Sequence, residues 1–376
     1  MPKRLGHLIV ACGGTGGHFY PALSVAREYC MQGGRATLLV SGKHAAEQAA
    51  AAARFGLETR EIRTVRSPAG LGEVVLFPFR MLACRRAVKK ILKELQGDLL
   101  LGMGSFAAVP PCWAWPWRRK PMVLHEGNAF MGRVNRLFAK RAKGIALSLP
   151  LADEAQLKGV PGRITGMPLR EAVIAAAAQP LGQDERAKLL TSLGLHPERK
   201  TMLVFGGSQG ARAINDLLAE TAPRLANLRE QLQFIALTGT DDNAQLAKAF
   251  AEAGLAARVV RGDPEIQRCY QVADLTLCRA GASSICELAL FRMPMVLVPL
   301  PAAADNHQLM NAKMLEKAGA ARCLEQRLAT PELLEDLLRE WLRNPQEWTA
   351  MGQAAAQFAH PDATKAVVEL LMEVSG

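Results

Sequence analysis

No apolar run in this chain of 376 residues approaches the roughly 20 residues that a membrane-spanning helix needs. The apolar stretch before Gly13 is also too short for the core of a signal peptide, so we expect a first β-strand there and a cytoplasmic protein. The eight cysteines include no Cys-x-x-Cys pair, and no histidine lies at zinc-finger spacing. They therefore indicate reduced, mostly buried thiols.

Acidic residues are too few to balance the basic ones: 35 Asp and Glu face 46 Lys and Arg, a formal net charge of +11. Residues 118–143 are strongly basic and contain a single acid, Glu126. This excess predicts an anionic partner, which is a nucleic acid, an anionic membrane face or a phosphorylated substrate. No nucleic-acid-binding motif accompanies it, so we expect no nucleic acid.

A dinucleotide-binding fingerprint and a Walker loop are also missing. G-x-G-x-x-G starting at Gly14 would need glycine at position 19, which is Phe19. The second apolar run ends "VSGKH", without the acid that holds a ribose. The sequence therefore argues against nicotinamide chemistry.

Short apolar runs do alternate with helical patterns along the chain, which predicts an α/β protein with parallel sheets. The expected strands are residues 7–12, 36–42, 98–102, 121–125 and 144–149, and then 201–205, 234–238, 258–261, 275–278 and 295–299. The second series restarts with "TMLVFGGSQGAR", which parallels "LIVACGGTGG". We expect two doubly wound domains, 1–167 and 168–345, and C-terminal helices in 346–376 that pack on either domain, including back on the first.

Glycine-rich turns follow the first strand of each expected domain. Glycine permits backbone angles closed to other residues and lets a ligand approach bare N–H groups at a helix N-terminus. Both turns therefore suit phosphates or a negatively charged transition state. His18 directly follows the first turn and is a candidate general base.

Three further polar motifs follow expected strands. "HEGN" (125–128) brings Glu126 and Asn128 to one loop, where Glu126 is either a buried ion-pair partner or a reacting group. "CRAGASSICELAL" (278–290) opens a helix with small residues that suit a diphosphate, and Glu287 suits ribose hydroxyls or complements the helix dipole. "DNHQ" (305–308) offers hydrogen bonds to a sugar or caps a helix.

Taken in order, "GGTGGH", "GMGSF", "HEGN…GRVNR", "GMPLR", "GGSQGAR", "CRAGASSICE" and "DNHQ…NA" resemble the MurG family of peptidoglycan glycosyltransferases. Such enzymes move N-acetylglucosamine from UDP-N-acetylglucosamine to lipid I (undecaprenyl-pyrophosphoryl-N-acetylmuramoyl-pentapeptide), giving lipid II. The resemblance implies a GT-B fold, with two Rossmann-like parallel-sheet domains facing across a cleft. It also implies inversion at the anomeric carbon, an acceptor on the N-terminal side, and no cofactor or bound metal.

The resemblance implies roles for individual residues, and we expect His18 to act as the base, with Glu126 as the alternative. The expected substrate contacts are Thr15, Gly16 and Gly17 near the donor, Asn128 at the sugar, Arg170 and Ser208 at the nucleotide, Asp263 at the uracil, Ala282, Ser283, Ser284, Ile285, Cys286 and Glu287 at the diphosphate and ribose, and Gln308 at the sugar hydroxyls.

The chain departs from the family at Gly127, where glutamine is usual, at Ser105-Phe106, and in the "RGDPEI" segment around Asp263. Two alternatives remain open. One is a UDP-N-acetylglucosamine 2-epimerase, for which extra acids would be expected near the substrate. The other is a non-catalytic protein that binds a UDP-sugar.

Two segments put large apolar groups beside basic clusters: "LFPFRMLACRRAVKK" (76–90) and "WAWPWRRK" (113–120). Three tryptophans in five residues are hard to bury together, which favours a surface position at the headgroup level. Alternatively, these aromatics form core with solvated basic flanks. We expect the N-terminal domain to bind peripherally to the anionic cytoplasmic face of the cell membrane.

Overall fold

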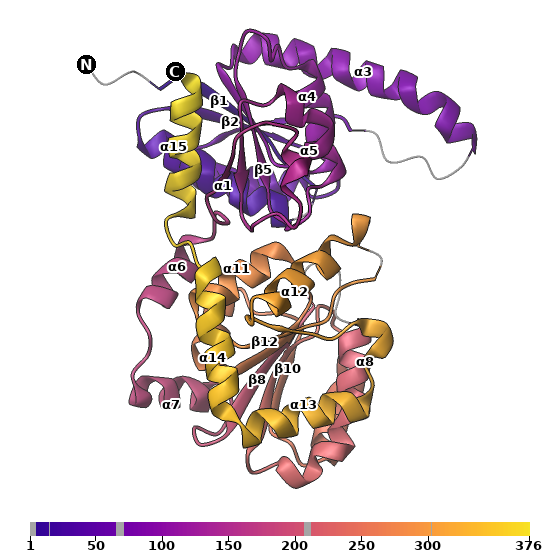
Figure 1. Ribbon diagram of the computed structural model, residues 1–376, viewed down its shortest axis with the longest axis vertical. Helices are drawn as coiled ribbons and strands as arrows, with labels where there is room; N and C mark the ends of the chain where they lie inside the picture. Colours follow the sequence, from indigo (N-terminus) through magenta and orange to yellow (C-terminus); the bar gives the residue numbers. More distant parts are fainter. Residues whose placement is uncertain (1–4, 15, 65–70, 207–211, 302) are drawn as a thin grey trace. The chain divides into compact units, whose positions relative to one another are not determined.

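The computed structural model describes residues 5–14, 16–64, 71–206, 212–301 and 303–376. The chain divides into two compact units: unit 1 comprises Met1–Arg170 and His360–Gly376, and unit 2 comprises Glu171–Ala359. Each unit contains one parallel sheet with helices packed around it (Figure 1). The expected pair of Rossmann-like α/β domains is therefore confirmed.

The described part of unit 1 has a seven-stranded parallel sheet in the order β3-β2-β1-β4-β5-β6-β7. Its strands are β1 (His7–Ala11), β2 (Arg35–Val40), β3 (Glu58–Glu61), β4 (Leu99–Gly102), β5 (Met122–Glu126), β6 (Gly144–Leu147) and β7 (Gly162–Ile164). Its α-helices are α1 (Gly16–Met31), α2 (Ala45–Ala53), α3 (Leu71–Leu95), α4 (Val109–Ala114), α5 (Arg133–Phe138) and α15 (Ala363–Ser375).

Both faces of this sheet are covered. Leu8 of β1 joins a buried cluster with Phe19 of α1 and Val367 of α15, whereas its neighbour Ile9 joins the opposite cluster with Leu92 of α3. Successive side chains of a strand point to opposite faces, so a strand buried on both sides is continuously apolar. This is why β1 was predictable as an uninterrupted apolar run.

The described part of unit 2 has a six-stranded parallel sheet in the order β10-β9-β8-β11-β12-β13. Its strands are β8 (Lys200–Phe205), β9 (Leu232–Leu237), β10 (Ala257–Val260), β11 (Leu275–Cys278), β12 (Met295–Leu297) and β13 (Arg322–Cys323). Its α-helices are α6 (Glu171–Ala178), α7 (Gln183–Ser192), α8 (Arg212–Thr221), α9 (Ala244–Glu252), α10 (Ile266–Val272), α11 (Ala282–Leu290), α12 (His307–Lys317), α13 (Pro331–Arg343) and α14 (Pro345–Ala355).

Each of the ten expected strands has a counterpart, with ends that differ by up to two residues, but three edge strands were missed. β3 reads "ETRE" and β7 is fully exposed, so neither shows the apolar run of a central strand. The C-terminal segment 346–376 is divided between the units. α14 packs in unit 2, and α15 returns to unit 1, where Val367 and Leu371 enter the core.

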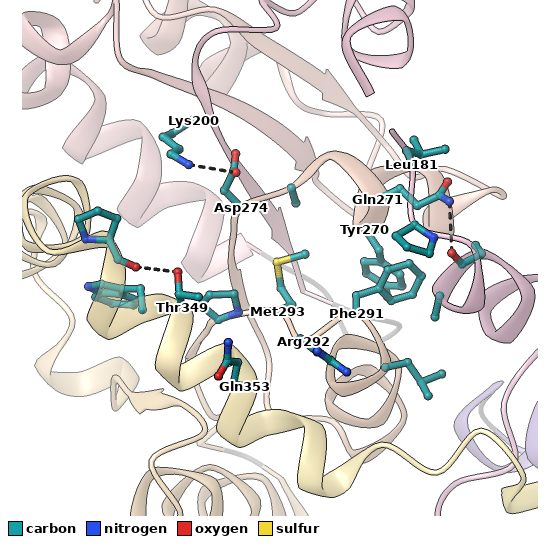
Figure 2. A pocket seen from close by; sticks show the side chains of 18 of the residues that line it. Leu181, Lys200, Tyr270, Gln271, Asp274, Phe291, Arg292, Met293, Thr349 and Gln353 are labelled. Atoms are coloured by element: carbon teal, nitrogen blue, oxygen red, sulfur yellow. Dashed lines mark hydrogen bonds and ion pairs between the residues drawn. The ribbon is translucent and has the colours of Figure 1, made fainter. Parts of the chain in front are cut away.

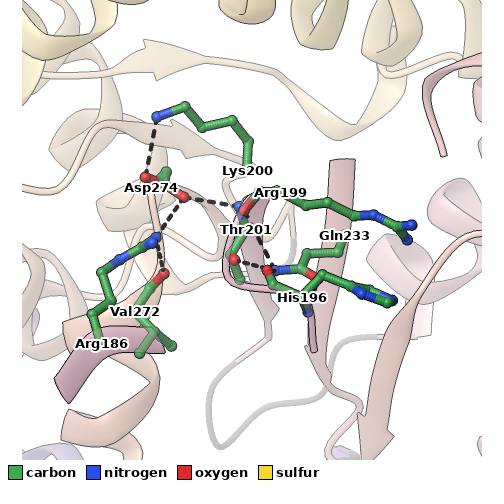
Figure 3. Close-up of polar contacts among 8 residues, drawn as sticks. All are labelled: Arg186, His196, Arg199, Lys200, Thr201, Gln233, Val272 and Asp274. Atoms are coloured by element: carbon green, nitrogen blue, oxygen red, sulfur yellow. Dashed lines mark hydrogen bonds and ion pairs between the residues drawn. The ribbon is translucent and has the colours of Figure 1, made fainter. Parts of the chain in front are cut away.

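A polar network holds α7 against the amino ends of the unit 2 strands. The Asp274 carboxylate accepts hydrogen bonds from Arg186 of α7 at 2.9 Å and from the backbone N–H of Thr201 at 2.9 Å, and Lys200 lies 3.4 Å away (Figure 3). Beside it, the buried Gln233 amide donates to the His196 carbonyl at 2.7 Å. These groups lie at the amino ends of the strands, opposite the carboxyl ends, and their contacts therefore stabilise the fold.

The expectation that the three clustered tryptophans lie at the surface is wrong for Trp115. Its side chain is 3% exposed, and its indole N–H donates to the carbonyls of Lys120 at 3.1 Å and Pro121 at 3.0 Å. Trp113 and Trp117 are partly buried against the same core cluster. A buried indole is tolerated because its only donor is satisfied.

Candidate active site

In each sheet, the chain first adds strands on one side of its first strand and later adds strands on the other side. The gap between the first strand and the first strand added on that other side is called the topological switch point. In unit 1 this point lies between β1 and β4, and in unit 2 between β8 and β11. Ligands of open parallel sheets bind at the carboxyl ends of the strands at such points. The segments that follow these four strands are therefore the natural places for a site.

The loop after β1 requires glycine. Gly13 and Gly14 have φ angles of 125° and 84°, which side chains rarely adopt, and a Cβ on Gly13 would lie 3.0 Å from the Ser41 amide nitrogen. Gly16 and Gly17 then open α1, and the first amides of a helix lack intrahelical partners at its positive end. Thr15 lies outside the described residues.

His18 bridges the unit 1 switch point. It lies in the first turn of α1, and its Nδ1 is 2.8 Å from the carbonyl oxygen of Met103, which follows β4. A carbonyl only accepts hydrogen bonds, so Nδ1 carries the proton and the basic lone pair lies on Nε2. This is the tautomer that a general base needs.

His125 is a buried imidazole near His18. Its Nε2 lies 3.0 Å from the Ser148 hydroxyl, and its side chain is buried near the carboxyl end of β5. Burial, and to a smaller extent the electrostatic interaction with His18, lowers the pKa of His125 to about 3. His125 is therefore neutral at physiological pH.

Glu126 is buried at the end of β5, and backbone and side-chain amides surround its carboxylate. Oε1 accepts from the Asn128 N–H at 3.0 Å and from the Asn128 side chain at 3.2 Å. Oε2 accepts from the Gly132 N–H at 2.8 Å and from the Asn135 side chain at 2.8 Å. The carboxylate thus organises the whole loop and fixes the Asn128 side chain.

In unit 2, α11 begins at the switch point with Gly281 as its N-cap. Its first intrahelical bond runs from the Ile285 N–H to the Gly281 carbonyl, so the amides of Ala282 to Ser284 point out of the helix end. Ser283, Ser284 and Glu287 are partly exposed on neighbouring helical positions. The Tyr270 hydroxyl donates to Glu287 Oε2 at 2.7 Å.

Hydrogen bonds connect the loop after β11 with the loop after β12. Arg279, 6% exposed, donates to the Val298 carbonyl at 3.1 Å, and the buried Asn311 side chain donates to the Ala280 carbonyl at 3.0 Å. Gln308 accepts from the Leu300 N–H at 3.0 Å through Oε1, which determines the orientation of its amide. Hydrogen bonds therefore hold the described parts of the two loops together.

The chain matches both domains of one enzyme family: the glycosyltransferase family 28 N-terminal domain over residues 8–147 and its C-terminal domain over residues 201–367. A Shewanella amazonensis protein named UDP-N-acetylglucosamine–N-acetylmuramyl-(pentapeptide) pyrophosphoryl-undecaprenol N-acetylglucosamine transferase is 34% identical over 100% of this chain and 99% of its own length. The crystal structure of Acinetobacter baumannii MurG has a TM-score of 0.76 at 28% identity, covering 98% of this chain and 99% of that one. This chain belongs to the MurG family.

Membership of the MurG family makes this chain a glycosyltransferase of the GT-B fold and confirms the resemblance drawn from the motifs. A UDP-GlcNAc 2-epimerase from Neisseria meningitidis has a TM-score of 0.68 at 11% identity, over 98% of this chain and 100% of that one. At this identity the likeness shows the fold alone.

Several of the expected MurG substrate contacts have side chains that contact the protein itself or lie outside the described residues, and Thr15 is one of the latter. The side chains of Ile285 and Cys286 are buried in the core, so a ligand contact from either residue would come from its backbone. Asp263 accepts from the Glu265 N–H at 2.8 Å and shapes its own loop. Ser208 lies outside the described residues.

Arg170, the last residue of unit 1, is partly buried. Sequence reasoning missed Tyr270, Arg279 and Asn311, although each lies in or near a quoted motif. The spacing of Asn311 three residues after Gln308, on one face of α12, was the available signal.

Proposed function

We propose that this protein transfers N-acetylglucosamine from UDP-N-acetylglucosamine to the 4-hydroxyl of lipid I, giving lipid II and UDP. The proposal depends mainly on one observation in this MurG-family chain: the candidate site residues lie at the topological switch points of the two sheets. A glycine loop with an oriented histidine lies at the switch point of unit 1, and an open helix N-terminus lies at that of unit 2. We assign the acceptor to unit 1 and the donor to unit 2.

In the proposed reaction His18 Nε2 takes the proton of the acceptor hydroxyl. The hydroxyl oxygen forms a bond to C1 of the sugar as the bond between C1 and the phosphate oxygen breaks, which inverts the anomeric carbon. The hydrogen bond from Nδ1 to Met103 holds the imidazole in the required tautomer. A well-placed base of this kind contributes about 10²–10⁴-fold.

The leaving diphosphate gains charge as the bond breaks. The outward amides of Ala282, Ser283 and Ser284, at the positive end of α11, are suited to stabilise it. Glu287 lies about one turn further along the helix, where a carboxylate accepts hydrogen bonds from ribose hydroxyls. Gln308 and Asn128 are oriented by their own hydrogen bonds and are assigned to the sugar.

Transfer of radiolabel from UDP-N-acetylglucosamine to a lipid I analogue tests the proposal. We expect lipid II and UDP in equal amounts, and no change of the UDP-sugar when the acceptor is omitted. Formation of an epimer without acceptor would instead indicate a 2-epimerase. Binding of the UDP-sugar with no product in either assay would indicate a non-catalytic binding protein.

We further propose that unit 1 binds an anionic membrane surface, at the cytoplasmic face, through α3. No helix in the described parts of the chain is long and apolar enough to cross a membrane. The N-terminal half of α3 projects from unit 1 (Figure 1), with Val75 67% and Phe79 70% exposed. Arg86 and Lys90 continue this exposed stripe at helical spacing.

Apolar insertion and charge attraction act together on such a surface. Each basic residue near an anionic membrane contributes about 1 kcal/mol, and salt weakens that contribution. We expect the wild-type protein to sediment with anionic vesicles at low salt, and a Val75→Glu, Phe79→Glu variant to stay in solution. The matched control is Leu328→Glu, Leu333→Glu, which places the same two charges at exposed leucines of unit 2. Equal binding by all three proteins would exclude α3 as the membrane contact.

A further inference from the structure

Tyr270 of α10 has a hydroxyl whose partner lies in the proposed donor site. The side chain is 2% exposed, and its hydroxyl donates to Glu287 Oε2 at 2.7 Å. A hydrogen bond to a charged carboxylate is stronger than one between neutral groups. The contact therefore couples a core residue to the partly exposed carboxylate that the proposed function assigns to the ribose.

The Tyr270 ring is held in place by two other aromatic rings. Phe205, the last residue of β8, has its ring centroid 6.3 Å away, and Phe291, directly after α11, has its centroid 5.2 Å away. Figure 2 shows Tyr270 beside Phe291 on the wall of a cavity of about 660 Å³. Because these neighbours limit the ring's movement, the position of the hydroxyl is set by the core of unit 2.

We infer that Tyr270 is a positioning residue that orients the Glu287 carboxylate towards the nucleotide ribose. It thereby determines how strongly the protein prefers UDP, which has a 2′-hydroxyl, over 2′-deoxy-UDP. This rests on the proposed function, in which Glu287 receives the ribose hydroxyls. An ionised carboxylate accepts about four hydrogen bonds, so it can hold Tyr270 and a ribose together. Tyr270 itself touches no ligand.

The expected effect follows from the freedom that glutamate regains. Loss of the Tyr270 hydrogen bond removes one constraint on the Glu287 side chain, and the rotamer entropy regained must be lost again on binding, which weakens ribose recognition by up to about ten-fold. The penalty applies only to a ligand that uses the carboxylate. UDP should therefore lose affinity, whereas 2′-deoxy-UDP should lose much less.

The test compares the dissociation constants of UDP and 2′-deoxy-UDP by calorimetry on the full-length protein. Tyr270→Phe removes only the hydroxyl and should reduce the wild-type preference for UDP by up to about ten-fold. Tyr29→Phe is the matched control: Tyr29 is also a buried tyrosine, and its hydroxyl donates to the Gly6 carbonyl in unit 1. The control should keep the wild-type preference.

A double-mutant cycle distinguishes an effect of Tyr270 on the Glu287 carboxylate from a general destabilisation of unit 2. In a Glu287→Ala background, Tyr270→Phe should cause no further loss of preference, because the side chain that it orients is absent. An unchanged preference in Tyr270→Phe, or equal losses in both backgrounds, would overturn the inference. Failure of the wild-type protein to transfer sugar would instead overturn the proposed function, since the transfer assay does not involve the deoxy ligand.

Discussion

Replacing Glu126 by glutamine distinguishes the two candidate bases. The Glu126 side chain is 3% exposed, and its two oxygens accept four hydrogen bonds from amides of the same loop. Glutamine keeps one acceptor oxygen and places an NH₂ group where the other was. The Gly132 N–H and the Asn135 side chain would then face a donor.

Each buried donor left without its acceptor costs about 1–3 kcal/mol, so we expect Glu126→Gln to lower the free energy of unfolding of unit 1 by about 2–6 kcal/mol. This is a large share of the about 5–15 kcal/mol that stabilises a typical domain. Because Glu126 then acts through the loop, turnover per folded molecule should fall by less than the about 10²-fold expected for a lost base.

Urea unfolding followed by hydrogen exchange of peptides from β4, β5 and β6 measures this stability within unit 1. Glu61→Gln, at an exposed glutamate that ends β3, is the control and should behave as wild type. A Glu126→Gln protein of wild-type stability with strongly reduced kcat would refute the reasoning. Glu126 would then be the base, and His18 would lose that assignment.

Three further predictions concern unit 1. His18→Ala should lower kcat by about 10²–10⁴-fold and leave UDP affinity nearly unchanged, and near-normal turnover would remove His18 as the base. Trp115→Ala should destabilise the protein by about 3–5 kcal/mol in thermal unfolding, whereas no shift in Tm would contradict its burial. Because the pKa of His125 is lowered to about 3, the unfolded chain binds a proton below its usual pKa of 6.5 and the folded chain does not. Stability should therefore fall by up to about 1.4 kcal/mol per pH unit as pH drops below 6.5, and His125→Gln should flatten this dependence in urea titrations.

Motif spacing predicted the loops that we propose as ligand-binding, but not the direction of individual side chains within them. Ile285 and Cys286 lie in the same short motif as Glu287, yet the helical period turns the first two into the core. Asp263 was assigned to the uracil from its place in the chain, through a backbone contact, and its side chain accepts from the Glu265 N–H. A one-dimensional motif does not state which face of an element is covered by the rest of the fold.

The chain's own residues determined the alternating α/β architecture, the two glycine turns and the MurG membership, because these depend on local periodicity, on backbone angles such as those of Gly13, and on motifs read in order. Only the tertiary structure decided which groups meet: His18 with Met103, 85 residues apart, and Tyr270 with Glu287 on different helices. It also decided that Trp115 is core, because nearby backbone carbonyls satisfy its indole N–H. The contacts of His18 with Met103 and of Tyr270 with Glu287 depend on strand order and packing, and no local pattern in the sequence records them.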